Sequence, residues 1–449
     1  MRKLASYWVI LQSLFVGVSA LAQDRTFDAM IDRELPGLVA TYKSLHAAPE
    51  LSRYEAKTSA FIASQLRSIG YDVTDHVGKY EHPEWKGYGV VAILKNGAGP
   101  TVLVRTELDA LPVEEQTGLP YASQVKTKND TGVEVSVMHA CGHDIHMTSL
   151  LGTAKMLAAL RNQWHGTLIL IGQPAEEALS GAQSMLADGM YRRFPKPDYC
   201  LALHDSADML AGKVGCAPGY TAASSTSVDV FIRGLGGHGA RPEATKDPIV
   251  AAAEFIMALQ TIVSRENSAF DPAVVTVGSI HGGTRYNIIP DEVHLQLTIR
   301  TYKEEVRQRI LASIDRIARS VALSEGIPED RAPIVKVNEG ESTPATYNDP
   351  QLTERMVGVF KNVLGSDNVE EIPPSMASED FGLFGLKGHQ IPVCMFALGA
   401  VDPVKMLEHQ QTGKPLPSLH SSLWAPLPEP TIRTGVKAMT AAVLELMKE

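Results

Sequence analysis

Residues 167–177 read TLILIGQPAEE, an apolar run that ends in two adjacent carboxylates. A continuous apolar run of this length predicts a strand buried on both faces, as in a parallel sheet. Similar runs occur at Thr101–Arg105 and Tyr199–Leu203. Helical patterns separate the runs, at about Ile145–Leu160 and Gly181–Met190. This alternation of strands and helices predicts an α/β fold with a mostly parallel sheet.

Polar side chains follow each predicted strand. Glu107 and Asp109 come after the first strand, Glu176 and Glu177 after the second, and His204 after the third. Ligands of open α/β sheets bind beyond the carboxyl ends of the strands, so we expect these groups to share one site. Each residue taken alone could equally be an ordinary loop residue. One carboxylate of the adjacent glutamate pair could bind a metal while the other acts as general base.

The densest cluster of metal-binding side chains is Met138–His146, MHACGHDIH. Imidazole and thiolate are ligands that divalent transition metals prefer, so the three histidines, Cys141 and Asp144 are all candidate ligands or proton carriers. The alternative is a polar loop before a helix with satisfied histidines. We interpret His139 and His146 as structural or supporting residues.

The pattern of elements changes near Gly219. The following segments alternate as strand, helix, strand, strand, helix and strand, at Ser227–Arg233, Asp247–Ser264, Ala273–Ile280, Glu292–Thr301, Lys303–Ser324 and Pro333–Asn338. This order is that of a ferredoxin-like unit. The sequence therefore predicts a catalytic domain from residues 23–219 and 342–449, interrupted by a smaller α+β domain at residues 220–341.

The first 22 residues are typical of an export signal. Arg2 and Lys3 precede an apolar run, and Ala20-Leu21-Ala22 offers a small-x-small cleavage site. We expect a periplasmic or secreted protein without a stable membrane anchor, because no other stretch is apolar and long enough to cross a bilayer. An uncleaved anchor is the alternative.

The net charge and the cysteines exclude two further classes of protein. A net charge of −10 argues against a nucleic-acid surface. Of the four cysteines, Cys200 and Cys394 lie in apolar runs and resemble small core residues, so no disulfide framework is expected.

Seven motifs in a fixed order resemble the M20 metallopeptidase family. They are LDALPVEEQTGLPYAS (108–123), MHACGHDIHMTSLLGTAKML (138–157), QPAEE (173–177), GLGGHGARPE (234–243), GGTRYNIIPD (282–291), MASEDF (376–381) and LHSSLW (419–424). The resemblance is to the amidohydrolase branch, which includes N-acyl-amino-acid amidohydrolases, hippurate hydrolases and plant auxin-conjugate hydrolases. It covers nearly the whole mature chain.

The resemblance implies a dinuclear metallo-amidohydrolase that cleaves N-acyl amino acids or similar small conjugates. It implies two divalent ions, zinc or manganese, with five ligands: Cys141, His143, Glu177, His204 and His420. Glu176 would be the general base, and Asp109 would support a metal ligand. The insertion would mediate a homodimer, in which His238 reaches the partner's active site and stabilises the oxyanion. Asn287 and Arg300 would lie near the substrate carboxylate.

The chain departs from the family pattern at Glu107, around Glu370–Met376 and at Trp424–Pro426, and several other functions stay open. Glu107 replaces a common Asp. The rival functions are an exported dipeptidase or carboxypeptidase, a non-catalytic metal- or ligand-binding protein, and a thiol redox protein using Cys141, which lacks a second Cys at C-x-x-C spacing.

Residues 234–239 also match G-x-G-x-x-G, but no helix follows at once, so a turn carrying His238 is favoured over a nucleotide site.

Overall fold

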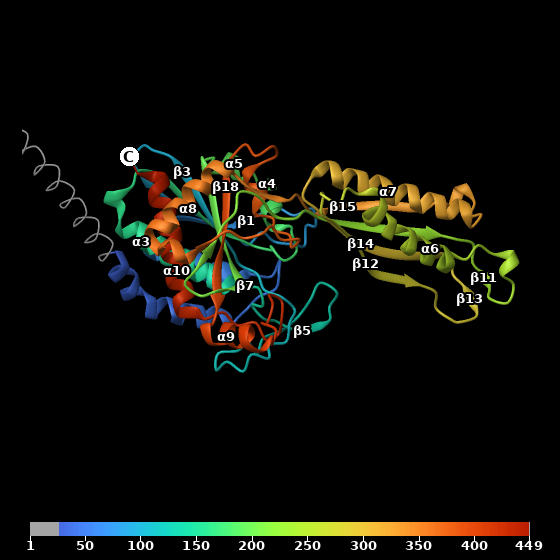
Figure 1. The fold of residues 1–449 in the computed structure, drawn as a ribbon, viewed down its shortest axis with the longest axis horizontal. Helices are drawn as coiled ribbons and strands as arrows, with labels where there is room; N and C mark the ends of the chain where they lie inside the picture. The colour runs from blue at the N-terminus through green and yellow to red at the C-terminus, as the bar shows by residue number, and fades with distance from the viewer. Residues whose placement is uncertain (1–26, 449) are drawn as a thin grey trace, which may run out of the picture.

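The computed structural model describes residues 27–448, which form a large α/β body and an elongated second lobe (Figure 1). The predicted export signal lies outside the described residues. The large body contains an eight-stranded sheet with the order β1-β2-β6-β3-β7-β18-β8-β17. Its strands are β1 (Asp72–Val77), β2 (Gly89–Asn96), β6 (Gly166–Gln173), β3 (Thr101–Glu107), β7 (Tyr199–Leu210), β18 (Val393–Val401), β8 (Val214–Gly215) and β17 (Val369–Glu370).

The centre of this sheet is parallel. β3 pairs in parallel with β6 and β7, and β18 continues in parallel from β7. The apolar runs form these strands because both faces are buried: Val102 and Val104 enter one core cluster, while Leu103 enters another. The carboxyl ends of β3, β6 and β7 therefore meet at one edge.

Helices cover both faces of the large sheet. The helix at residues 27–46 packs into the first core cluster together with α2 (Ala56–Ile69), α3 (His143–Ala159), α8 (Pro350–Leu364) and α10 (Pro428–Met447). The second cluster lies under α4 (Gly181–Ala187), α5 (Met190–Arg193) and the short helix η6 (Phe381–Gly385). One further helix, α9 (Pro403–Thr412), has no buried residue.

The second lobe has its own sheet and core. Its elements are β10 (Ser225–Arg233), α6 (Pro248–Thr261), β12 (Ala273–Gly282), β14 (Glu292–Thr301), α7 (Glu304–Ser324) and β15 (Ile334–Thr343). The sheet order β12-β14-β10-β15 is antiparallel throughout, with the strand-helix order of a ferredoxin-like unit. The predicted fold class, an α/β body with an inserted ferredoxin-like unit, is confirmed.

Small strand pairs flank these sheets. β9 (Gly219–Ala222) pairs with β16 (Thr346–Asn348) where the chain enters and leaves the lobe. The ribbon of β11 (Gly237–His238) and β13 (Ile288–Ile289) lies at the lobe's far end (Figure 1). The hairpin of β4 (Lys126–Lys128) and β5 (Glu134–Ser136) belongs to the large body.

Three expectations need correction. The predicted helix Gly181–Met190 is broken at Gly189, whose φ of 82° ends α4 and begins α5. β7 runs on to Leu210, so His204 lies within this strand rather than after it. One helical stretch, Pro248–Glu266, is long and apolar enough to cross a membrane, contrary to the sequence analysis, although its inner face packs on the lobe's sheet.

Candidate metal centre

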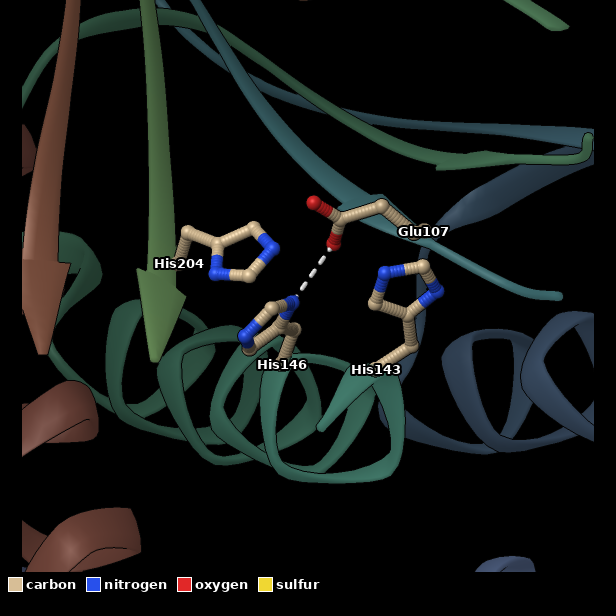
Figure 2. Close-up of side chains that lie close together, drawn as sticks. All are labelled: Glu107, His143, His146 and His204. Carbon is tan, nitrogen blue, oxygen red and sulfur yellow. Dashed lines mark hydrogen bonds and ion pairs between the residues drawn. The ribbon is translucent and has the colours of Figure 1, made fainter. Parts of the chain in front are cut away.

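The parallel strands bring the predicted polar groups to one edge of the large sheet. β3 ends at Glu107, β6 ends just before the Glu176–Glu177 loop, and β7 carries His204. Figure 2 shows Glu107, His146 and His204 facing a common space, with His143 beside them at the start of α3. The expectation that these residues converge follows from strand direction alone.

Gly142 sets the geometry of the Cys-Gly-His turn. It adopts a left-handed φ of 74° at the N-cap of α3. A Cβ at this position would lie 2.0 Å from Oδ2 of Asp205, so a larger residue would collide with a buried carboxylate. The turn therefore presents Cys141 and His143 to the same space.

The structure brings the five predicted metal ligands together. The Sγ atom of Cys141 lies 3.5 Å from Nε2 of His204 and 3.3 Å from Nε2 of His420. Nε2 of His143 lies 3.9 Å from Oε1 of Glu177, and Nε2 of His420 lies 3.5 Å from the other oxygen of that carboxylate. The thiol thus contacts the imidazoles of His204 and His420, and the Glu177 carboxylate lies near the imidazoles of His143 and His420.

Backbone contacts fix the orientation of two of the histidines. Nδ1–H of His143 donates to the carbonyl oxygen of Asp109 (2.8 Å), and Nδ1–H of His204 donates to that of Asp205 (2.8 Å). Each ring therefore keeps its Nε2 lone pair directed into the site, which is the arrangement that metal-binding histidines use.

The donor set fits divalent cations. Nε2 of His143 and Oε1 of Glu177 are buried and have no hydrogen-bond partner among the described residues. Burial raises the pKa of Glu177 to about 7, although the neighbouring His143 opposes this shift. Burial and nearby carboxylates also raise the pKa of the Cys141 thiol well above its usual range. Cations here would satisfy the lone pairs and stabilise the anionic donors.

Glu176 lies beside this donor set. Its Oε2 atom is 3.8 Å from Nε2 of His143, and the residue is 5% exposed. Burial, followed by the charges of Glu379 and Glu177, raises the pKa of Glu176 well above its usual range. A carboxyl group with a raised proton affinity next to metal donors suits a residue that accepts a proton.

A buried ionic network lies behind Glu176, and the sequence did not indicate it. The guanidinium of Arg105 donates to Glu379 at 2.7 Å, and also contacts Glu107 and Asp380. Asp380 in turn accepts from the backbone N–H of Ala182 (3.0 Å). Glu379 and Asp380 are 274 and 275 positions from Arg105, so no local pattern could have joined them to it.

Glu379 and Asp380 contact Arg105, and Glu379 also contacts the start of the short helix that follows. The pair lies at the site through Arg105, and Oε1 of Glu379 accepts from the backbone N–H of Phe381 (2.8 Å), at the start of η6.

The supporting residues take the following places. Nδ1–H of His146 donates to Glu107 (2.8 Å), and Nε2 of His146 accepts from the backbone N–H of Asp205 (2.8 Å). Oδ1 of Asp109 lies 3.5 Å from Nδ1 of His143, and Oδ2 of Asp109 accepts from the backbone N–H of Glu177 (3.0 Å). The longer side chain of Glu107 thus finds a partner in His146.

The structure does not bring the insertion residues to this site within one chain. His238 and Asn287 are exposed at the far end of the lobe, on and beside the β11–β13 ribbon (Figure 1). Arg300, on β14, contacts the hydroxyl of Ser378, one residue before Glu379. Only Arg300 therefore approaches the large body.

Comparisons with known proteins agree with this geometry. A model of peptidase family M20/M25/M40 matches residues 103–414. The chain is 37% identical to hippurate hydrolase from Campylobacter jejuni over 342 residues, 76% of this chain and 82% of the relative. It is 34% identical to N-acetyldiaminopimelate deacetylase from Limosilactobacillus fermentum over 408 residues, 90% of this chain and 96% of the relative.

A solved structure resembles the whole molecule. The dinuclear metal-binding peptidase of the M20 family from Bacillus subtilis is 26% identical, with a TM-score of 0.71 over 93% of this chain and 99% of that one. The chain belongs to peptidase family M20/M25/M40, in its amidohydrolase branch, and is a metal-dependent hydrolase of amide bonds.

Proposed function

We propose that the protein hydrolyses N-acyl amino acids, or similar small conjugates with a free carboxylate, with Glu176 as general base. The observation that carries this proposal is the position of Glu176, 3.8 Å from His143 and adjacent to the ligand candidate Glu177. A protein that only stores metal needs no such carboxylate beside its donors. The similarity to hippurate hydrolase and to deacetylases supports the substrate class.

The proposed metal ligands are Cys141, His143, Glu177, His204 and His420, and the metals are zinc or manganese. Two divalent cations at this site would polarise the amide carbonyl and make water a stronger nucleophile at neutral pH. Glu176 accepts the proton of the attacking water and delivers it to the leaving amine. Asp109 holds His143 in place, because it contacts both that ring and the backbone of Glu177.

We propose that the active site is completed in a homodimer, with His238 from one subunit stabilising the oxyanion in the other. Asn287 and Arg300 bind the substrate carboxylate. The apolar surface of the lobe supports a dimer: Val250 and Met257 on α6 are 52% and 73% exposed, and β12 is an edge strand. Exposed apolar patches of this kind mark protein contacts.

The domain and export predictions belong to the same proposal. Residues 23–219 and 342–449 form the catalytic domain, and residues 220–341 form the dimerisation domain; the separate core of the lobe supports this division. Residues 1–22 direct export to the periplasm or outside the cell. The basic start and the small-x-small cleavage site of this segment support the proposal.

Glu176→Gln tests the proposal. We expect turnover to fall by about 10³-fold or more while the bound metal, measured by elemental analysis, stays unchanged. Glu354→Gln, an exposed change on α8, is the matched control and should keep full activity. Retained turnover in Glu176→Gln would remove this residue from the mechanism. A panel of N-acetyl, N-benzoyl and dipeptide substrates separates an amidohydrolase from a dipeptidase.

A further inference from the structure

Two cysteines far from the metal centre are in contact. The Sγ atoms of Cys216 and Cys394 lie 3.7 Å apart, and the residues are 2% and 0% exposed. Cys216 directly follows β8, and Cys394 lies on β18. The apolar run around Cys394 predicts only a small core residue, and 178 positions separate it from Cys216.

The strand register places both side chains on the same face of the sheet. β8 and β18 are antiparallel, with Val214 opposite Leu398. Side chains alternate between the faces of a strand, so Cys216 and Cys394 point to the same side as this pair. All four residues belong to one core cluster. The contact between the sulfur atoms is thus a result of sheet pairing.

The other two cysteines have different surroundings. Cys141 lies among the candidate metal ligands, and Cys200 contacts the carbonyl oxygen of Phe384 at 4.0 Å. Among the described residues, Cys216 and Cys394 are therefore the pair for which a sulfur–sulfur contact is found.

We propose that Cys216 and Cys394 form a reversible disulfide, with a protein or small-molecule disulfide as the oxidant. The two thiols lose two protons and two electrons, and the Sγ–Sγ bond forms. The oxidant's own disulfide bond breaks, and its two sulfur atoms take up those electrons and protons as thiols. The inference does not depend on the proposed hydrolysis, and an oxidising compartment, as export would provide, favours it.

The site can adapt to the bond. The sulfur atoms must approach from 3.7 Å to about 2.05 Å, which needs side-chain rotation and a small backbone shift. β8 is only two residues long. Ala217 and Pro218, which follow Cys216, line a cavity of about 660 Å³. A short strand end beside a cavity can move and admit an oxidant more easily than the centre of a sheet.

The crosslink would enclose the whole inserted lobe. Cys216 lies just before the chain enters the lobe through β9, and Cys394 lies after it has returned through β16. The bond would tie the two-residue strand β8 to β18 and hold the two sides of this loop together. A chain cut inside the lobe would then stay in one piece until it is reduced.

The test is a thiol count on the full-length protein before and after incubation with oxidised glutathione at mildly alkaline pH. Denatured reduced protein should show four thiols, and the oxidised protein two, with a mass lower by two hydrogen atoms. Peptide mapping should recover Cys216 linked to Cys394. The oxidised form should melt about 3 °C higher or more than the reduced form.

Three variants make the result specific. Cys216→Ser and Cys394→Ser should each abolish the crosslink and the oxidation-dependent shift in melting temperature, whereas Cys200→Ser should keep both. Four thiols in the oxidised wild-type protein would overturn the proposal. A crosslink that involves Cys141 or Cys200, or glutathione adducts without a crosslink, would also overturn it.

Discussion

The two groups of proposed active-site residues differ in how completely one chain assembles them. Each proposed metal donor of the large body has another donor within 4 Å in the same chain: Cys141 lies 3.5 Å from His204, and His143 lies 3.9 Å from Glu177. His238, by contrast, is exposed at the far end of the lobe. One chain alone thus brings the proposed metal donors together, whereas the proposed oxyanion contact of His238 requires a second subunit. Substitutions in the two groups should therefore differ in their effects on metal content and on activity.

The largest effect is expected from Cys141→Ala. Cys141 contacts both His204 and His420, so its loss removes the donor that lies between these two histidines. We expect activity to fall by about 10³-fold or more, with reduced metal content after dialysis. Elemental analysis and initial rates measure the two effects. Full metal content in this variant would contradict the assignment of Cys141 as a ligand.

His238→Ala should damage catalysis but spare the metal. Loss of one oxyanion contact lowers kcat by about 10²- to 10³-fold, while metal content stays at the wild-type level. Mixing this variant with Glu176→Gln and allowing subunits to exchange should restore about a quarter of wild-type activity, because half of the dimers regain one complete site. If no activity returns, His238 does not act across a dimer.

The stability of the buried group rests partly on Arg105. Arg105→Met leaves Glu107, Glu379 and Asp380 without their buried cation, and we expect the free energy of unfolding to fall by about 3 kcal/mol or more. Urea unfolding measures this change. Arg433→Met is the control, because its ion pair with Asp32 is partly exposed and should contribute less than about 1 kcal/mol. Equal losses would show that burial does not matter here.

The most gradual effect, small over any one pH unit, is a pH dependence of stability from His46. Burial opposes its charge, but hydrogen bonds to Asp144 and Glu115 raise the pKa of His46 to about 10. The rings of Tyr42 and Tyr121 pack against it. The stabilisation is complete below about pH 6.5, the usual histidine value, and is lost as pH rises toward 10.

Urea midpoints between pH 6.5 and 10 measure this loss, at most about 1.4 kcal/mol per pH unit. His46→Asn should flatten the profile, whereas His281→Asn, an exposed change on β12, should leave its slope unchanged. A flat wild-type profile would contradict the prediction.

Local patterns predicted much of the fold. The strand Glu292–Thr301 was located to the residue, because its inward and outward side chains alternate clearly. The buried strand β3 was recognised because it is apolar on both faces. The antiparallel strand β2 is not among the predicted strands, although its apolar residues are also buried. The end of β7 was missed since polar residues after Leu203 resemble a loop.

The candidate site divides in the same way. Its donors could be named because strand direction and the quoted motifs point to them. The contacts of Arg105 with Glu379, and of Cys216 with Cys394, depend on tertiary packing between distant segments. The sequence carries no local signal for either contact.

The position of His420 has a consequence for the synthesis of the chain. This donor lies 279 residues after Cys141, and its backbone N–H donates to the carbonyl oxygen of Ala140 (2.7 Å). A ribosome must therefore complete the insertion and return to the large sheet before the cluster can close. Until then a nascent chain offers only part of the proposed donor set, without the residue that contacts both Cys141 and Glu177.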